Sequence, residues 1–217
     1  DLGERLSRFV ERAATFTLPN KKAAYELTHI VFYLSEYGAS DLCLSNAALT
    51  SLEFTGVLAY LDQNHDLLAE GCTALRFAGV EPNEIWTDAV ARAHKRITPS
   101  AVCDEGPSID SFHAFLVTGW AQAVRGAPSF EHPVPEGPLY FASEAQTPGV
   151  LRPLSECLYE LGPKRRSDWA GMRARIVPHL EPESRDILQR AEASTTNFDA
   201  FFEGFARASS GLVPMAS

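Results

Sequence analysis

The segment 20–38, NKKAAYELTHIVFYLSEYG, constrains the fold most, because it has helix signals at both ends and apolar residues on two faces. Asn20 is a residue type that caps helix starts, and Gly38 is one that closes helices in the left-handed conformation. Two stripes recur between them at helical spacing: Leu27, Ile30, Val31 and Leu34, and Tyr25, His29, Phe32, Tyr33 and Glu36. A helix with two such faces packs on both sides, so the segment predicts an inner helix surrounded by others.

Similar helical patterns cover most of the chain, at residues 2–16, 45–63, 64–79, 82–96, 108–125, 150–161, 167–177 and 182–207. Residues 98–107 are expected to form a loop, and short apolar runs such as Leu139–Phe141 are too brief to predict a sheet. The sequence therefore predicts an all-α fold. We expect a helical core at 1–126, a connecting segment with five prolines at 127–149, and C-terminal helices packing on the core at 150–208.

Composition excludes several classes of partner. The 217 residues are 45% hydrophobic, which suits a globular domain with its own core. The formal net charge of −9 argues against nucleic acid and against an anionic membrane surface, since both attract basic proteins. No run of eighteen apolar residues is present, so the sequence predicts no membrane span.

Cysteine usage and the visible ends suggest a cytoplasmic protein. The four cysteines are far apart and form no CxxC pair, which is typical of reduced thiols: Cys43, Cys72, Cys103 and Cys157. No signal peptide is visible. Residues 209–217, SGLVPMAS preceded by Ser209, resemble a vector-derived protease-site scar and are left out of the fold prediction.

Two carboxylates within segment 64–79 are candidates for acid–base chemistry. Asp66 and Glu70 are four residues apart, so both point to the same side of the predicted helix. Asp66 is explained equally well by a favourable position in the first helical turn. Glu70 is flanked by apolar residues, and burial of a carboxylate raises its pKa towards the range that a general acid or base needs.

Two histidines are each the least expected polar residue of an apolar helix. His29 lies among the aromatic residues of segment 20–38, and His113 lies near the start of segment 108–125. Each could be a core histidine satisfied by one hydrogen bond, or an acid–base group lining a cavity. If the three helices line one cavity, His29, Glu70 and His113 converge with Asp66 nearby. The same set could form a two-histidine, one-carboxylate metal site, although no HExxH or comparable motif supports it.

The other polar candidates are weaker. His65 is expected to be a loop or cap residue, and His94, His132 and His179 have no special surroundings in the sequence. Lys164–Arg166, with Arg173 and Arg175, forms the one basic cluster. Such a cluster is either a solvated face or a subsite for an anionic group, and we expect Arg166 to hold that group. We expect Tyr25, Tyr33 and Trp120 to contact the substrate.

The segments ELTHIVFYLSEYG, DLLAE…ALRFAG and SFHAFLVTGWA together resemble a group of small actinobacterial helical proteins that occur near natural-product gene clusters. The resemblance covers about residues 20–126 and implies helical hairpins in an α/α-toroid-like array, with His29, Asp66, Glu70 and His113 facing a central cavity. A further resemblance is to the protein pairs that form the aziridine ring of azabicyclic antibiotics. It implies intramolecular displacement of a sulfate-type leaving group by an amine.

These observations favour a cofactor-independent tailoring enzyme that acts on a small molecule with an anionic group. Glu70 or Asp66 would accept a proton, while His29 and His113 would orient the substrate. The main alternative is a non-catalytic helical subunit that binds a second protein. That alternative is motivated by the aromatic stripe Phe198, Phe201, Phe202 and Phe205 and by the lack of a strong catalytic motif.

Overall fold

The computed structural model describes residues 2–101, 111–131, 133–144 and 147–208. Helices dominate this part of the chain, which confirms the all-α prediction. The first group of helices is α1 (Leu2–Val10), α2 (Lys21–Leu34), α3 (Asn46–Leu61), α4 (His65–Phe77), α5 (Glu84–Lys95) and α6 (Phe112–Val124). The second group is α7 (Leu151–Leu161), α8 (Trp169–Ile176), α9 (Pro182–Ala193) and α10 (Phe198–Ala206).

Side-chain caps begin the helices where the sequence places them. The Asn20 side chain accepts a hydrogen bond from the Ala23 amide at 3.1 Å, and Ser45 accepts one from Ala48 at 3.3 Å. Asn64 caps α4 in the same way through the Leu67 amide. These bonds satisfy amides that have no partner within the helix, so each cap fixes where its helix starts.

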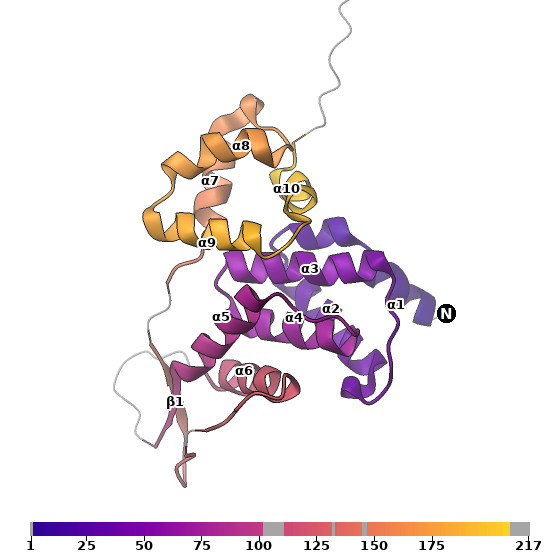
Figure 1. Cartoon of the computed structure of the whole chain (residues 1–217), viewed down its shortest axis with the longest axis vertical. Coiled ribbons are helices and arrows are strands. Elements are labelled where there is room, and N and C mark those ends of the chain that lie inside the picture. Colours follow the sequence, from indigo (N-terminus) through magenta and orange to yellow (C-terminus); the bar gives the residue numbers. More distant parts are fainter. Residues whose placement is uncertain (1, 102–110, 132, 145–146, 209–217) are drawn as a thin grey trace, which may run out of the picture.

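The innermost helix is α4 rather than α2. Every residue of α4 from Leu67 to Leu75 is buried, and α4 packs against α2, α3, α5 and α6 (Figure 1). On α2, by contrast, Leu34 is 42% exposed and Ile30 is only half-buried. The prediction that segment 20–38 is buried on two sides was therefore wrong for its second half. A short 3₁₀ turn, η2 (Glu36–Gly38), follows α2, and Gly38 has the expected positive φ of 85°.

Two short strands were not predicted. Strand β1 (Ile97–Ser100) pairs antiparallel with β2 (Tyr140–Ser143), with Pro99 opposite Phe141. Residues 98–107 are thus not loop throughout, and Tyr140–Ser143 does form part of a two-stranded sheet. Ile97 and Phe141 pack with Phe115 of α6 in a small hydrophobic cluster. This cluster, rather than strand propensity, accounts for the pairing, because isolated two-stranded ribbons are only marginally stable.

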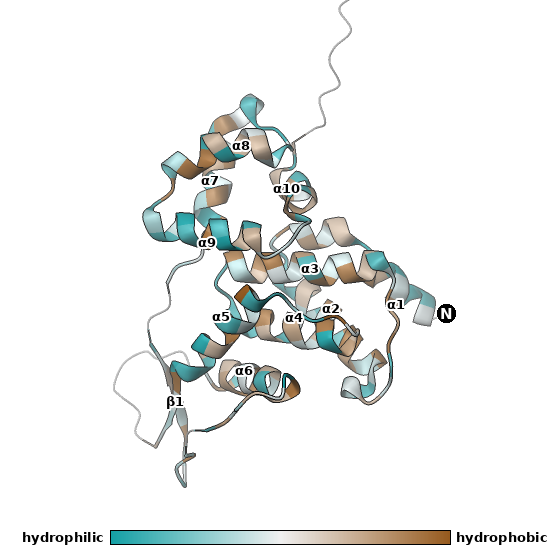
Figure 2. Ribbon diagram, viewed as in Figure 1, coloured by the Kyte–Doolittle hydropathy of each residue, from teal (hydrophilic) through white to brown (hydrophobic). Residues whose placement is uncertain are grey.

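The second group of helices packs above α3 in the view of Figure 1. The four phenylalanines of the C-terminal stripe are buried. Trp169 contacts Phe198 edge-on and Phe202 at a tilt, with ring centroids 5.1 and 4.8 Å apart. The stripe belongs to the core of the chain and gives no support for a partner-binding surface. Figure 2 shows hydrophilic residues over most of α9, the helix at the edge of this group.

The remaining predictions concern membrane spans, the cysteines and the toroid-like arrangement. No helix among the described residues has both the length and the apolar character needed to span a membrane. Cys43, Cys72 and Cys157 are free thiols, whereas Cys103 and residues 209–217 lie outside the described residues. The toroid-like arrangement with a central cavity is not confirmed.

Candidate functional site

Glu70 is a buried carboxylate in the middle of α4. It is 2% exposed, and its Oε2 accepts a hydrogen bond of 2.5 Å from the Thr28 hydroxyl of α2. Nε2 of His29, one residue further along α2, lies 3.6 Å from the same oxygen, within ion-pair distance. Burial raises the pKa of Glu70, while the Thr28 hydrogen bond and the nearby His29 act in the opposite direction. The net rise places Glu70 among groups that can exchange a proton closer to neutral pH.

Asp66 lies one turn before Glu70 and connects three helices. Its Oδ2 accepts a 2.6 Å hydrogen bond from the Tyr25 hydroxyl of α2, and its Oδ1 lies 2.8 Å from Nδ1 of His113 on α6. Burial, followed by the hydrogen bond to Asp66, raises the pKa of the Tyr25 phenol well above its ordinary value. Tyr25 therefore stays a neutral donor to this carboxylate throughout the physiological range.

The two carboxylates form two parallel carboxylate–histidine pairs, Glu70–His29 and Asp66–His113. Both acids come from α4, whereas the histidines come from the neighbouring helices α2 and α6. The side chains of His29 and His113 are 53% and 64% exposed, while those of Glu70 and Asp66 are only 3% and 20% exposed. In each pair the imidazole is thus exposed to solvent, and a more buried carboxylate contacts it from the protein side. Charges on Asp66 and His113 also influence Glu70, so the two pairs share one electrostatic environment.

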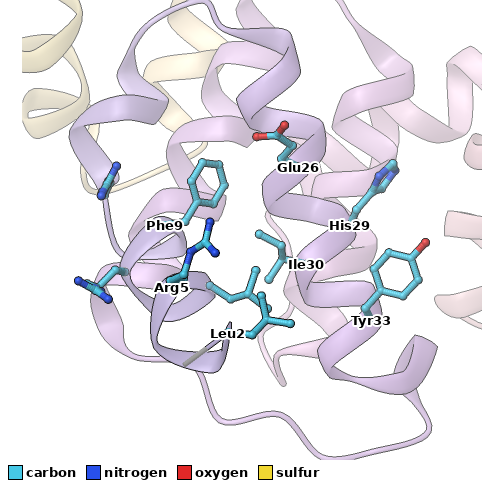
Figure 3. Close-up of a pocket in the computed structure, with 10 residues that line it drawn as sticks. Leu2, Arg5, Phe9, Glu26, His29, Ile30 and Tyr33 are labelled. Atoms are coloured by element: carbon cyan, nitrogen blue, oxygen red, sulfur yellow. The ribbon is translucent and has the colours of Figure 1, made fainter.

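A groove of about 760 Å³ lies between α1 and α2, and of the four residues of the two pairs His29 lines it. Figure 3 shows Ile30 pointing towards Leu2 and Arg5, while His29 and Tyr33 project from the other side of α2 and line the groove at its edge. Three arginines of α1 and the turn after it also line the groove: Arg5, Arg8 and Arg12. Arg8 is 4.0 Å from Glu4, but Arg5 and Arg12 have no ion-pair partner among the described residues. Glu26 also lines the groove, so three arginines face one carboxylate there, and the groove can receive a negatively charged group close to His29.

The structure separates the predicted substrate-contacting residues. Tyr25 belongs to the hydrogen-bond network of Asp66, and Tyr33, 68% exposed, lines the groove. Trp120 instead packs against Phe32, with ring centroids 5.0 Å apart, and against Phe77, which is a structural role. Arg166 lies between Lys164 and the start of α8, in the second helical group, and has no contact with the cluster among the described residues. It is not placed to hold a substrate at His29.

The sequence offers no reason to single out four polar residues that the structure places in a groove, in a cleft or in the core: Arg5, Arg12, His65 and His94. In the sequence Arg5 and Arg12 form only the polar side of an amphipathic helix, although with Arg8 they recur at positions three and four apart. His94 is buried, with Nδ1 3.0 Å from the Thr118 hydroxyl and its ring stacked on Phe115. His65 is largely enclosed, and its Nδ1 has no hydrogen-bond partner in the part of the chain that the structure describes. No local pattern distinguishes His65, because residues from α5 and α9 enclose it.

The metal alternative has no candidate ligand set in the described part of the chain. There, no group of three or more histidine, cysteine, aspartate or glutamate side chains is arranged to hold a metal ion. In each pair the histidine nitrogen nearest the acid faces a carboxylate oxygen directly, at 2.8 Å in one pair and 3.6 Å in the other. These distances are those of a hydrogen bond in the Asp66–His113 pair and of an ion pair in the Glu70–His29 pair.

The fold and the cluster together define an all-helical protein with two carboxylate–histidine pairs on its central helix. The chain belongs to the family described as domain of unknown function DUF6902, whose model matches residues 1–208. The match spans both helical groups, so the cluster and the C-terminal helices belong to one family unit. Searches of curated proteins and of solved structures find no match.

Proposed function

We propose that this protein is an enzyme that performs acid–base chemistry on a small anionic molecule at the two carboxylate–histidine pairs. The observation that carries the proposal is their geometry: two exposed imidazoles, each backed by a more buried carboxylate, with the two acids one turn apart on α4. A pair of proton-transfer groups in one place can remove a proton from one atom of a substrate and deliver one to another.

The geometry supports a division of roles that differs from the one expected from the sequence. Glu70 is buried and already accepts a hydrogen bond from Thr28, so it is poorly accessible to a substrate. His29 is exposed and borders the groove. We therefore assign proton exchange with the substrate to His29 and His113. Glu70 and Asp66 are positioning residues that orient the imidazoles and stabilise their protonated forms, as the acid does in serine-hydrolase triads.

The arginines of α1 take the role expected of Arg166. A guanidinium binds carboxylate, sulfate or phosphate through paired N–H donors, and Arg5 and Arg12 are not engaged by carboxylates of the described chain. An anionic group bound there would lie in the groove that His29 borders. We propose this groove as the substrate subsite, with Tyr33 covering an apolar part of the molecule.

Intramolecular ring closure belongs to the reactions that such a site supports. The amine nitrogen would form a bond to carbon while the carbon–oxygen bond to a sulfate-type group breaks, and one histidine would accept the proton that nitrogen loses. The departing anion would remain with the arginines. Holding the substrate in an attack conformation would supply much of the rate. This reaction is proposed from the sequence resemblance, and the arginine-lined groove beside His29 supports it.

A binding subunit without chemistry is the second candidate. The observation in its favour is the exposure of Tyr33 and Tyr37, at 68% and 56%, with their rings in an edge-to-face contact of 5.7 Å. Exposed tyrosines are common at protein interfaces. This function requires neither histidine, which separates it from the enzyme proposal.

Solvent deuterium exchange tests the proposal and does not require the substrate to be identified first. The protein is incubated in D₂O with a mixture of small anionic metabolites, and mass spectrometry follows deuterium incorporation and conversion. We expect activity in the wild type and in His179→Asn, a control at an exposed histidine of the second helical group. We expect its loss in His29→Asn and His113→Asn. Activity that persists in both variants, or no exchange with the wild type, would contradict the enzyme proposal.

A further inference from the structure

A second cleft, of about 690 Å³, is lined by residues of α5 and α9. Figure 1 shows these two helices where the two helical groups meet. The cleft is separate from the groove beside His29 and shares no lining residue with it. Its walls include His65 and three arginines: Arg92 and Arg96 from the C-terminal part of α5, and Arg190 from α9. Nothing in the proposed acid–base mechanism uses these residues.

His65 supplies the first indication of a ligand. It is the first residue of α4, and its Nδ1 is buried without a hydrogen-bond partner among the described residues. Buried polar atoms are nearly always hydrogen-bonded, so the described residues leave this nitrogen, which belongs to a residue that lines the cleft, unsatisfied.

The charges of the cleft supply the second indication. Arg92 and Arg96 are one helical turn apart and reach the cleft from the same helix. Arg92 has no ion pair among the described residues, and Arg96 is only 3.9 Å from Glu144, which does not line the cleft. Burial, and after it the positive field of these two arginines, lowers the pKa of His65 to about 4. The net charge of the chain is −9, so the positive potential of this cleft is opposite in sign to the charge of the whole protein.

The carboxylates in the cleft do not cancel this charge. Asp186 is held by Arg190 at 2.9 Å, along the same helix. Glu183 is the other acidic residue of the lining, and Tyr60 is the remaining titratable group. Three arginines face two carboxylates, so the cleft keeps an excess of positive charge that lies nearest to Arg92 and His65.

We propose that the cleft between α5 and α9 is a binding site for a phosphate-bearing small molecule. The phosphate lies between Arg92 and Arg96 and accepts hydrogen bonds from their N–H groups, beside the imidazole of His65. Two adjacent guanidinium groups match the two negative charges of a phosphate dianion better than the single charge of a carboxylate. The volume is in the range of small-molecule sites and leaves room for an organic group beyond the phosphate. This site does not depend on the enzyme proposal.

Inorganic phosphate is the probe for the test. The imidazole signals of His65 in the full-length protein are followed by NMR as phosphate is added at constant ionic strength. We expect saturable changes and a rise in the pKa of His65, because a bound anion stabilises imidazolium. In the double variant Arg92→Gln/Arg96→Gln the dissociation constant is expected to increase about tenfold or more. Arg175→Gln, at an exposed arginine of α8 with no ion pair among the described residues, is the matched control.

Both variant arginines are exposed, so the fold should survive their replacement, and circular dichroism checks this. Binding that is equally strong in the double variant would overturn the proposal, as would changes in the His65 signals that do not saturate. Equal weakening in Arg175→Gln would show that phosphate responds to overall charge only, and this also contradicts a built site.

Discussion

Nδ1 of His113 lies 2.8 Å from Oδ1 of Asp66, a residue 47 positions earlier in the sequence. A carboxylate accepts hydrogen bonds, so the hydrogen is assigned to Nδ1, and Nε2 of His113 is left as the acceptor. Since the His113 side chain is 64% exposed, that acceptor is accessible to a small molecule. The relationship determines which nitrogen of His113 Asp66 holds and which one would be available to a substrate under the proposed function.

Replacing Tyr25 by phenylalanine removes one of the two hydrogen bonds to Asp66 and leaves the bond to His113. We expect a loss of about 1.5–3 kcal/mol in the free energy of unfolding, the usual value for a hydrogen bond to a charged acceptor. Chemical denaturation measures it. Tyr159→Phe is the control, because that side chain is 84% exposed and has no partner among the described residues. Equal stability of the two variants would show that the Tyr25 hydroxyl does not stabilise the cluster.

The raised pKa of Glu70 predicts a pH-dependent difference between the wild type and Glu70→Gln. The folded state binds the proton of Glu70 more tightly than the unfolded state does. The contribution of Glu70 to stability is therefore present below its unfolded pKa and is lost as the pH rises through the folded value. Glutamine stays neutral and can still accept the Thr28 hydrogen bond, so the variant should gain stability relative to the wild type as the pH rises.

Unfolding curves of both proteins from about pH 4 to 8, the range that brackets a raised carboxyl pKa, measure this difference directly. A relative loss of stability in Glu70→Gln as the pH rises would mean that the attraction of His29 and the Thr28 bond outweigh burial. The pKa of Glu70 would then be depressed rather than raised. Glu203→Gln, at an exposed glutamate of α10, should leave the pH dependence close to that of the wild type.

Two glycines should respond in opposite ways to replacement by alanine. A Cβ at Gly149 would lie 2.6 Å from the backbone of Asp62, and the adjacent Val150 amide donates to the Leu61 carbonyl at 2.7 Å. The chain cannot move away without breaking this contact, so Gly149→Ala should cost about 1–3 kcal/mol. A Cβ at Gly71 in α4 meets nothing within 4 Å, and alanine there should stabilise by about 0.5–1 kcal/mol. Thermal unfolding of both variants measures the contrast.

The thiols should differ sharply in reactivity. Cys72 is 1% exposed, and burial raises its pKa to about 12, whereas Cys43 is exposed. Iodoacetamide reacts with thiolates, so under native conditions we expect rapid labelling of Cys43 and almost none of Cys72. Peptide mass spectrometry after timed labelling distinguishes them, and labelling in denaturant provides the reference. Similar rates at both sites in the native protein would contradict the packing of α4.

Much of the helical fold could be predicted because its signals are local. The caps at Asn20, Ser45 and Asn64 act within one turn of their own helix, so sequence alone shows where those helices begin. The strands could not be found in this way. Ile97–Ser100 contains a proline and is stabilised by β2, some forty residues later, and by Phe115 of α6. Its conformation is decided by tertiary contacts.

The sequence could identify the residues of the polar cluster, but it could not show which acid pairs with which histidine. Glu70 and His113 stand out because each is an unexpected polar residue among apolar neighbours, and the structure brings them into one environment with Asp66 and His29. The pairing of each acid with its histidine depends on how α2 and α6 pack against α4, which periodicity does not specify. The same limit explains why the sequence favours Arg166 over the arginines of α1: charge density along the chain does not show which helix end lies near the groove.

The distribution of the pairs over three helices makes the histidines internal probes of tertiary order. The signal of His29 depends on the docking of α2 against α4, and that of His113 depends on the docking of α6. A partly folded form that keeps its helices but loosens one of these contacts would disturb one imidazole and leave the other unchanged. The same arrangement means that no fragment of this chain that lacks α2, α4 or α6 can contain both pairs, so the two pairs are a property of the assembled helices and of no linear motif.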